Sequence, residues 1–541
     1  MYADIILNSV GEKRNIITME SGNPFEEALA IKDGKIIAIG LNRDLECLKG
    51  SKTKVIDLDD NIAMPGFIDA HAHFITYGTN MLGINLKSED VKSIGDIKNK
   101  VRERAESSPP GKWIRGWGYD HTKLIEKRHP DRFDLDEVAK NYPVILTRTC
   151  GHIAVVNSKA LELAGLKDDA SDPPGGKFGR YDGKLNGVLY ESAQRKVTAA
   201  AAFTLEEYKS AIKQANYGFL SKGITSVSDA GMGGRLGIQG LIESFVERKI
   251  QVRVNLFASN ILGDNIGDYF LETGLTTGFG NNFISLGPYK VMVDGSSSGP
   301  TCATRKAYTS DINNTGILYY TQDELDRLIE KAHIRGFQLS AHCVGDKAIE
   351  MMLNAIEKAF KKHPKKHFKG LRPRIEHCAI CPADLVERIK RLGVIPVVQP
   401  IFFHEFGDGY IENYGRERTN YMFPLKSFIN NNILAAMSTD APVSMLDPLK
   451  NIYEAVTRKT LSGKSCGQAE CITVYDALRA YTYNSAYASF QEDIKGSLKV
   501  GKLGDVVVLS KNILEVPIDN ISDIKVEMTI SNGEIVYINE S

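Results

Sequence analysis

Two histidines one residue apart, His71 and His73, end the apolar run 66–74. Side chains two apart on a strand share a face, so the run predicts a strand that presents two imidazoles side by side. Neutral imidazoles are common ligands of divalent metals, and the pair could chelate a metal ion. The alternative is a pair of hydrogen-bonded core histidines, because an isolated three-residue match arises easily by chance.

Further ionisable residues stand at or near the ends of other apolar runs: Lys290, His342, His377 and Asp440. Each histidine alone could be a satisfied core residue, and Lys290 a salt-bridged strand end. Taken together with His71 and His73, they predict a metal site. A lysine ammonium beside cations would be repelled, but a neutral lysine can add carbon dioxide, and the resulting carbamate is an anionic ligand able to bridge two metals.

Eight strand-like apolar runs could position these residues. They cover residues 66–74, 223–231, 252–259, 288–295, 338–346, 374–378, 395–400 and 435–442. Segments with helical periodicity lie between most of them, for example 321–335 and 382–392. Strands alternating with helices indicate parallel βαβ units, and eight of them predict an α/β protein with a (β/α)8 TIM barrel over 65–489. In such barrels the active site lies at the carboxyl ends of the strands.

Two further regions do not fit the barrel repeat. The interval 86–220 is too long for one crossover helix and predicts a subdomain inserted after the first barrel strand. Both ends of the chain contain short strand-like runs with hairpin turns at Asp33-Gly34 and Asn532-Gly533. Residues 1–64 and 490–541 are therefore predicted to form one small composite β-sandwich.

Composition excludes several classes of partner. Sixty-seven basic residues balance sixty-seven acidic residues among 541, so no global field would recruit nucleic acid or an anionic membrane. No leader-like segment or membrane-spanning apolar run is present in the sequence, and the eight scattered cysteines suit reduced thiols. We expect a cytoplasmic protein that acts on a small, neutral or zwitterionic molecule.

Longer motifs surround the candidate ligands. They read M-P-G-F-I-D-A-H-A-H-F, R-G-W-G-Y-D, G-H-I-A-V-V-N-S-K-A-L, G-V-L-Y-E, Y-K-V-M-V-D-G, A-H-C-V-G-D-K-A-I, R-I-E-H-C, S-T-D-A-P-V and G-S-L-K-V-G-K-L-G-D-V-V-V-L. Their order resembles the amidohydrolase superfamily, and within it amidohydrolase family 3, the branch of the YtcJ-like proteins and N-substituted formamide deformylase. One departure concerns the loop after the fourth strand. Relatives usually read A-D-G-S-L-G-S-R-T-A where this chain has V-D-G-S-S-S-G-P-T-C-A.

The resemblance implies a binuclear metal centre. His71, His73 and Asp440 would bind one ion, His342 and His377 a second, and carboxylated Lys290 would bridge them. We expect Zn2+, with Mn2+, Fe2+ or Co2+ as alternatives and with one or two ions per chain. The implied reaction is hydrolysis of an amide-type C–N bond by metal-activated hydroxide, with Asp440 moving the proton as general base and acid. A purely structural ligand is the alternative for Asp440.

Three residues of the insert, Arg148, His152 and Glu191, are candidates for substrate binding, and Arg148 or His152 could stabilise an oxyanion. A surface or packing role is as compatible with the sequence. Relatives commonly dimerise, so a homodimer is an open expectation. The loop after the fourth strand, which differs from relatives, prevents transfer of their specificity to this chain.

Other functions stay open. Related deaminases of aminated heterocycles carry a glutamate three residues after the strand-five histidine, where this chain has Gly345, although Asp346 could substitute. The same chemistry would serve a carbamate, an ester or a lactone. A non-catalytic barrel protein is the remaining alternative, and such a protein would be expected to lose ligands that this chain keeps.

Overall fold

The protein is described by a computed structural model that covers residues 2–11, 13–87, 90–149, 151, 153–231, 233–261, 264–364 and 370–540. Two compact units share this chain. The first consists of Met1–Ile75 and Ala215–Ser541, and the second of Thr76–Gln214. Over the described residues, no helix combines the length and the apolar character that crossing a membrane requires.

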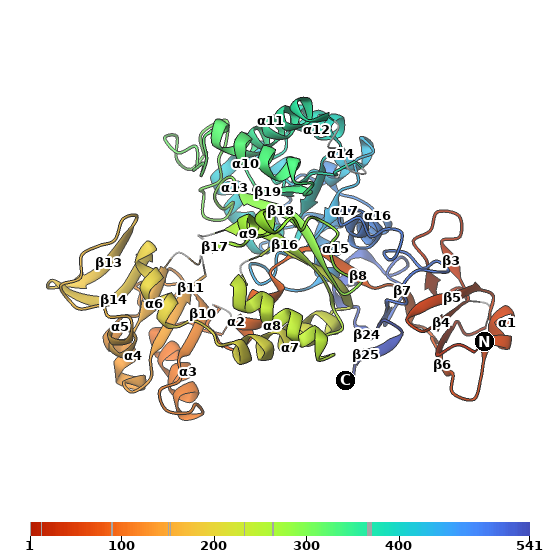
Figure 1. The fold of residues 1–541 in the computed structure, drawn as a ribbon, viewed down its shortest axis with the longest axis horizontal. Helices are drawn as coiled ribbons and strands as arrows, with labels where there is room; N and C mark the ends of the chain where they lie inside the picture. The colour runs from red at the N-terminus through yellow and green to blue at the C-terminus, as the bar shows by residue number, and fades with distance from the viewer. Residues whose placement is uncertain are drawn as a thin grey trace. The chain divides into compact units, whose positions relative to one another are not determined.

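Eight parallel strands form the barrel in the first unit (Figure 1). In chain order they are β8 (Phe67–Ala72), β15 (Ile224–Asp229), β16 (Arg253–Ile261), β18 (Ile284–Met292), β19 (Leu339–Cys343), β20 (Arg374–His377), β21 (Ile395–Val398) and β22 (Ala436–Met437). Beyond β22, the Asp440 N–H donates to the His71 carbonyl oxygen at 2.8 Å, and the His73 N–H donates to the Ala441 carbonyl oxygen at 2.8 Å. These bonds join the last strand to the first, so the predicted barrel is confirmed.

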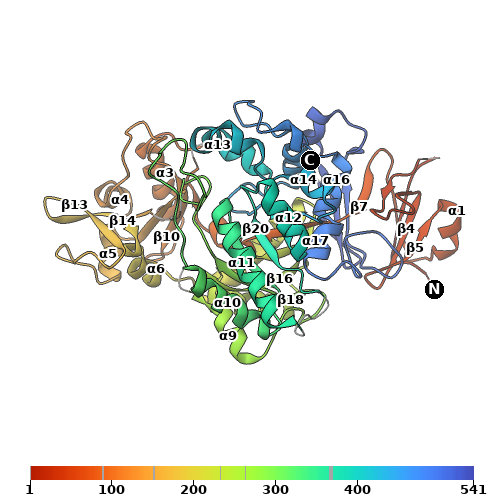
Figure 2. The same ribbon diagram turned by 90° about the horizontal axis from the view of Figure 1, so that it is seen from above.

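The crossover helices begin and end at capping residues that the sequence contains. In α10 (Gln322–Ile334), Thr321 and Glu324 form a reciprocal capping box, and α12 (Ala383–Leu392) ends at Gly393, which has a φ of 64°. Together with α11 (Asp346–Lys362), these helices lie side by side along the outside of strands β18 to β20 (Figure 2). Both helical ranges predicted from periodicity therefore contain helices.

Both chain ends contribute to two β-sheets beside the barrel. One sheet has the order β5 (Lys35–Gly40), β4 (Ala28–Lys32), β1 (Ile5–Asn8) and β6 (Lys54–Asp57). The other has the order β25 (Glu534–Ile538), β24 (Val526–Ser531), β23 (Val506–Leu509), β7 (Ile62–Pro65), β2 (Ile16–Ile17) and β3 (Phe25–Glu26). Buried side chains from both sheets, such as Leu7, Leu29, Val506 and Ile530, share one core.

The second unit is built on a mixed sheet in the order β13 (Gly176–Tyr181), β14 (Lys184–Glu191), β12 (Ile153–Val156), β11 (Val144–Arg148), β10 (Ile114–Tyr119) and β9 (Ile84–Asn85). Strands β9, β10 and β11 run parallel. The helices α3 (Ile94–Glu106), α4 (Arg132–Ala139) and α5 (Ser158–Leu163) supply buried residues to its two apolar cores. In sequence, this unit stands between barrel strands β8 and β15.

Candidate metal centre

Three candidate ligands meet at the carboxyl end of the barrel. One possible ligand atom from each of His71, His73 and Asp440 lies within 4.8 Å of the others. Asp440 Oδ1 is 3.4 Å from His71 Nε2 and 3.2 Å from His73 Nε2. All three side chains are buried. A strand that ends in His-x-His thus brings both imidazoles to one carboxylate, which follows the last strand of the barrel.

The other three candidates adjoin this group. The ring centroids of His71 and His377 are 5.0 Å apart, and those of His377 and His342 are 4.5 Å apart. Lys290 Nζ lies 3.2 Å from His71 Nε2. The structure therefore brings all six residues predicted from the strand ends into one continuous cluster.

Each histidine of the cluster has its Nδ1 against a hydrogen-bond acceptor. His71 Nδ1 faces Glu376 Oε2 at 2.6 Å, and His73 Nδ1 faces the Gly231 carbonyl oxygen at 3.1 Å. A carboxylate or a carbonyl oxygen can only accept, so the proton of each neutral imidazole stands on Nδ1. The Nε2 atoms of His71 and His73 then present lone pairs to Asp440.

The remaining two imidazoles follow the same rule. His342 Nδ1 lies 3.1 Å from Asp294 Oδ1, and His377 Nδ1 lies 2.9 Å from Gln399 Oε1. The Gln399 amide nitrogen donates to Ser438 Oγ, which leaves its oxygen to accept from His377. Imidazoles that bind metals through Nε2 typically donate Nδ1–H to such a partner.

Burial sets the charge of these groups. It lowers the pKa of His377 to about 3 and holds the pKa of His71 well below its ordinary value, so both rings are neutral at pH 7. Burial also lowers the pKa of Lys290 to about 8, which leaves a fraction of neutral amine.

The donor set of this cluster fits a divalent cation. Asp440 Oδ1 is buried, and no N–H or O–H group among the described residues donates to it. Two imidazole nitrogens lie 3.2 and 3.4 Å from it, and their lone pairs cannot stabilise a negative oxygen. A buried carboxylate oxygen that faces lone pairs is costly unless a cation lies between them. Histidine nitrogen and carboxylate oxygen are the ligands that Zn2+ and related ions prefer.

Two of these residues hold unusual backbone conformations. His377 has a φ of 71° and Asp440 a φ of 60°, both in the left-handed region. A residue other than glycine costs about 1 kcal/mol or more there. Asp69 supports the second turn, because its carboxylate accepts the Thr439 hydroxyl at 2.5 Å and the Thr439 N–H at 3.1 Å. The strained turns aim the two side chains into the cluster.

Sequence reasoning missed the acceptors behind the histidines. Glu376 and Gln399 were not identified, although Glu376 stands within the R-I-E-H-C motif and Arg374 lies two residues before it. These two opposite charges, two residues apart in a buried strand, could have revealed Glu376. Their spacing predicts an ion pair on one face of the strand. Asp294, which ends the motif Y-K-V-M-V-D before Gly295, contacts His342 in the same way.

The insert candidates lie in the second compact unit. Arg148, at the end of β11, donates from Nη2 to Asp120 Oδ1 at 2.8 Å and from Nε to His121 Nδ1 at 3.1 Å. Glu191, at the end of β14, is exposed and has a φ of 50°. His152 lies outside the described residues. Within this unit, Arg148 therefore belongs to a local group of polar side chains. Its role in substrate binding stays a prediction.

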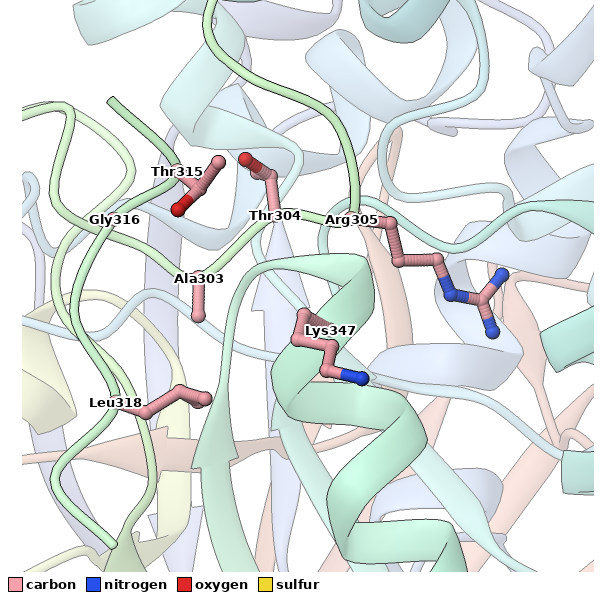
Figure 3. A pocket seen from close by; sticks show the side chains of 7 residues that line it. All are labelled: Ala303, Thr304, Arg305, Thr315, Gly316, Leu318 and Lys347. Atoms are coloured by element: carbon pink, nitrogen blue, oxygen red, sulfur yellow. The ribbon is translucent and has the colours of Figure 1, made fainter. Parts of the chain in front are cut away.

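None of the six clustered residues lines a surface hollow of about 380 Å3. The hollow is lined by Ala303, Thr304, Arg305, Thr315, Gly316, Leu318 and Lys347 (Figure 3). Arg305 pairs with Asp384 at 2.8 Å and with Glu350 at 3.1 Å, and Lys347 pairs with Glu350 at 3.1 Å. Arg305 and Lys347 are thus already paired with acidic side chains. The hollow is therefore a weaker candidate for an active site than the buried cluster.

Comparison with known proteins identifies relatives over nearly the whole chain. A family model described as "Amidohydrolase family" matches residues 54–537. The Bacillus subtilis (strain 168) protein named "Putative amidohydrolase YtcJ" is 29% identical over 532 residues, which cover 96% of this chain and 98% of that protein. N-substituted formamide deformylase of Arthrobacter pascens is 25% identical over 540 residues, which cover 97% of each chain. Among solved structures, an uncharacterized metal-dependent hydrolase from Pyrococcus horikoshii OT3 has a TM-score of 0.79 and 27% identity, with 95% of this chain and 99% of that chain covered.

Proposed function

Since the chain belongs to the amidohydrolase family, we propose that it hydrolyses a carbon–nitrogen bond of a small molecule with the help of a divalent metal. One observation carries the proposal. A buried carboxylate oxygen of Asp440 faces the Nε2 atoms of His71 and His73 without any described donor. A cation bound between these groups would attract both the carboxylate and the imidazole lone pairs. It would also act as a Lewis acid at the carboxyl end of the barrel.

We propose the following ligands. His71, His73 and Asp440 would hold one ion, and His342 with His377 would hold a second. Lys290 would bridge the two as a carbamate, formed when neutral Nζ bonds to the carbon of CO2 and releases a proton. The burial of Lys290 supports this step, because the neutral amine is the form that reacts. Zn2+ suits nitrogen and oxygen donors, and Mn2+, Fe2+ and Co2+ are the alternatives.

A bound divalent cation would polarise the substrate carbonyl and lower the pKa of a bound water to roughly 7. Asp440 would then transfer the proton. As a ligand of a divalent cation, Asp440 would be ionised, so one of its carboxylate oxygens could accept the proton that the attacking water loses. Asp440 would return that proton to the leaving nitrogen as the C–N bond breaks. The products are a carboxylic acid and a free amine.

Deamination of a heterocycle is less well supported than amide hydrolysis. The position of the expected glutamate is Gly345, where an added Cβ would lie 1.9 Å from the Ala303 carbonyl oxygen. Asp346 does not replace it, because its carboxylate accepts the Arg305 backbone N–H at 2.8 Å at the start of α11. Carbamates, esters and lactones would use the same proton transfer, so they belong in the substrate panel.

Product detection by mass spectrometry tests the proposal. Zinc- or manganese-loaded protein would be incubated with N-formyl, N-acetyl and longer N-acyl amines, carbamates, lactones and aminated heterocycles. We expect free amine and acid from at least one amide, with the product lost in Asp440→Asn. Asp60→Asn is the matched control, because its carboxylate is exposed and, among the described residues, forms an ion pair with Lys13 alone. An Asp440→Asn variant as active as Asp60→Asn would contradict the role given to Asp440.

A further inference from the structure

We propose that Glu376 is a positioning residue for the metal centre: it fixes the proton of His71 on Nδ1 and so directs the Nε2 lone pair of His71 toward the metal. The inference rests on the proposed function, because it takes His71 to be a ligand. It adds a residue that neither touches the substrate nor binds the ion. Its effect would pass entirely through His71.

Glu376 is fully buried and accepts four hydrogen bonds. Its Oε2 accepts from His71 Nδ1 at 2.6 Å and from Arg374 Nη2 at 3.0 Å. Its Oε1 accepts from Ser340 Oγ at 2.7 Å and from Arg374 Nε at 2.8 Å. A carboxylate with a bidentate guanidinium partner is held in one orientation. His71 therefore meets a fixed carboxylate oxygen.

Arg374 extends this support to the backbone and to the ring of His71. Its Nη2 also donates to the Ala70 carbonyl oxygen at 2.6 Å, one residue before His71 in β8. The guanidinium lies 4.8 Å from the centroid of the Phe257 ring, and that ring packs edge-on to His71 at 6.4 Å. The Glu376–Arg374 pair thus restrains both the strand that carries His71 and the plane of its imidazole.

The other imidazoles lie farther from their acceptors, at 2.9 to 3.1 Å. His73 uses a backbone carbonyl, and His377 uses the neutral amide of Gln399. His342 contacts Asp294, whose Oδ1 also accepts the Val344 N–H at 3.0 Å. His71 has the shortest of these contacts, and its acceptor is charged. A charged acceptor makes the opposite imidazole nitrogen a stronger donor to a metal, and removing such a partner typically weakens metal affinity about 10- to 100-fold.

The test compares Glu376→Gln with Asp505→Asn. Asp505 is a matched control, because it is also buried and paired with an arginine, Arg253, at 2.6 and 2.9 Å. Both variants lose one buried carboxylate charge, but only Glu376 contacts His71. Affinity for Zn2+ would be measured by competition with a chromophoric chelator, and the ligand field would be followed by the visible absorption of Co2+-loaded protein.

We expect Glu376→Gln to bind Zn2+ about 10- to 100-fold more weakly than the wild type and to shift the Co2+ spectrum, with Asp505→Asn within about twofold of the wild type. Equal affinity of Glu376→Gln and the wild type would overturn the inference, and so would an equal loss in both variants. A wild-type protein that binds no divalent metal would instead reject the proposed function itself.

A milder variant keeps the inference testable if Glu376→Gln does not fold. Ser340→Ala removes one neutral donor to Glu376 and leaves the carboxylate and Arg374 in place. We expect a smaller loss of Zn2+ affinity in the same direction, with the Co2+ spectrum shifted. Unchanged affinity and an unchanged spectrum in Ser340→Ala would count against the role of Glu376.

Discussion

The Asp440→Asn substitution should stabilise the metal-free protein while it abolishes turnover. In the wild type, Asp440 Oδ1 is buried and faces the Nε2 atoms of His71 and His73, whose protons stand on Nδ1. An asparagine amide placed in the same position can donate N–H to His73 Nε2, 3.2 Å away in the wild type. The substitution would therefore convert an unsatisfied contact into a hydrogen bond.

The size of this effect follows from the cost of the unsatisfied oxygen. Leaving a buried acceptor without a partner costs about 1 to 3 kcal/mol, and more when the group is charged. A gain of about 1 to 3 kcal/mol in a unit as large as the barrel raises Tm by roughly 1 to 4 °C. The same change removes the proposed metal ligand and proton acceptor, so activity should fall about 100-fold or more.

Differential scanning calorimetry tests the prediction on chelator-treated protein and on protein with excess Zn2+. We expect Asp440→Asn to melt above the wild type without metal and to gain less than the wild type from added Zn2+. Asp60→Asn should follow the wild type in both conditions. A metal-free Asp440→Asn protein that melts below the wild type would refute the proton assignment, because it would show that an imidazolium had been stabilising the carboxylate.

Two further predictions concern buried lysines. Lys290→Ala should lower the bound metal measured by elemental analysis, and short carboxylic acids should restore part of it, whereas unchanged metal content would exclude the carbamate bridge. Burial lowers the pKa of Lys495 to about 7 from 10.5, so the unfolded chain binds the extra proton between these values and stability rises with pH across that window. Between pH 7 and 9 the wild type should gain about 2 kcal/mol more stability than Lys495→Met, measured by denaturant unfolding, and equal gains would contradict the lowered pKa of Lys495.

The barrel could be predicted because each of its strands carries its own local signal. Short apolar runs bounded by glycine and proline correspond to the eight parallel strands, and caps such as Thr321 with Glu324 mark the helices between them. The last run, 435–442, forms a strand of only two residues, Ala436–Met437. The remainder turns through Asp440, whose left-handed backbone no periodicity reveals. The family motifs, which also predicted the amidohydrolase relationship, are confirmed by the match over residues 54–537.

The candidate ligands could be predicted because they are residue types that are rare at the ends of apolar strands. The hydrogen-bond acceptors of the histidines, such as Glu376, could not be predicted. Glu376 precedes the ligand candidate His377 in sequence, yet it contacts His71, 305 positions away. Such a contact depends on which strands become neighbours and on a φ of 71° at His377, which breaks the alternation of the strand. Sequence periodicity would place Glu376 and His377 on opposite faces, but both side chains contact the same cluster.

Charges buried at the two ends of the barrel strands have different consequences. At the amino-terminal ends, Arg253 pairs with Asp505 at 2.6 Å, and Lys495 donates to Ser226 Oγ at 2.9 Å, which fastens the C-terminal segment to β15 and β16. These groups have partners of opposite charge or a hydroxyl within the fold, so their contribution is to stability. At the carboxyl ends, Asp440 Oδ1 is buried and no group among the described residues donates to it. Because the amino-terminal charges have partners within the chain and Asp440 Oδ1 has no described donor, the variants Asp505→Asn and Asp440→Asn should shift stability in opposite directions in metal-free protein.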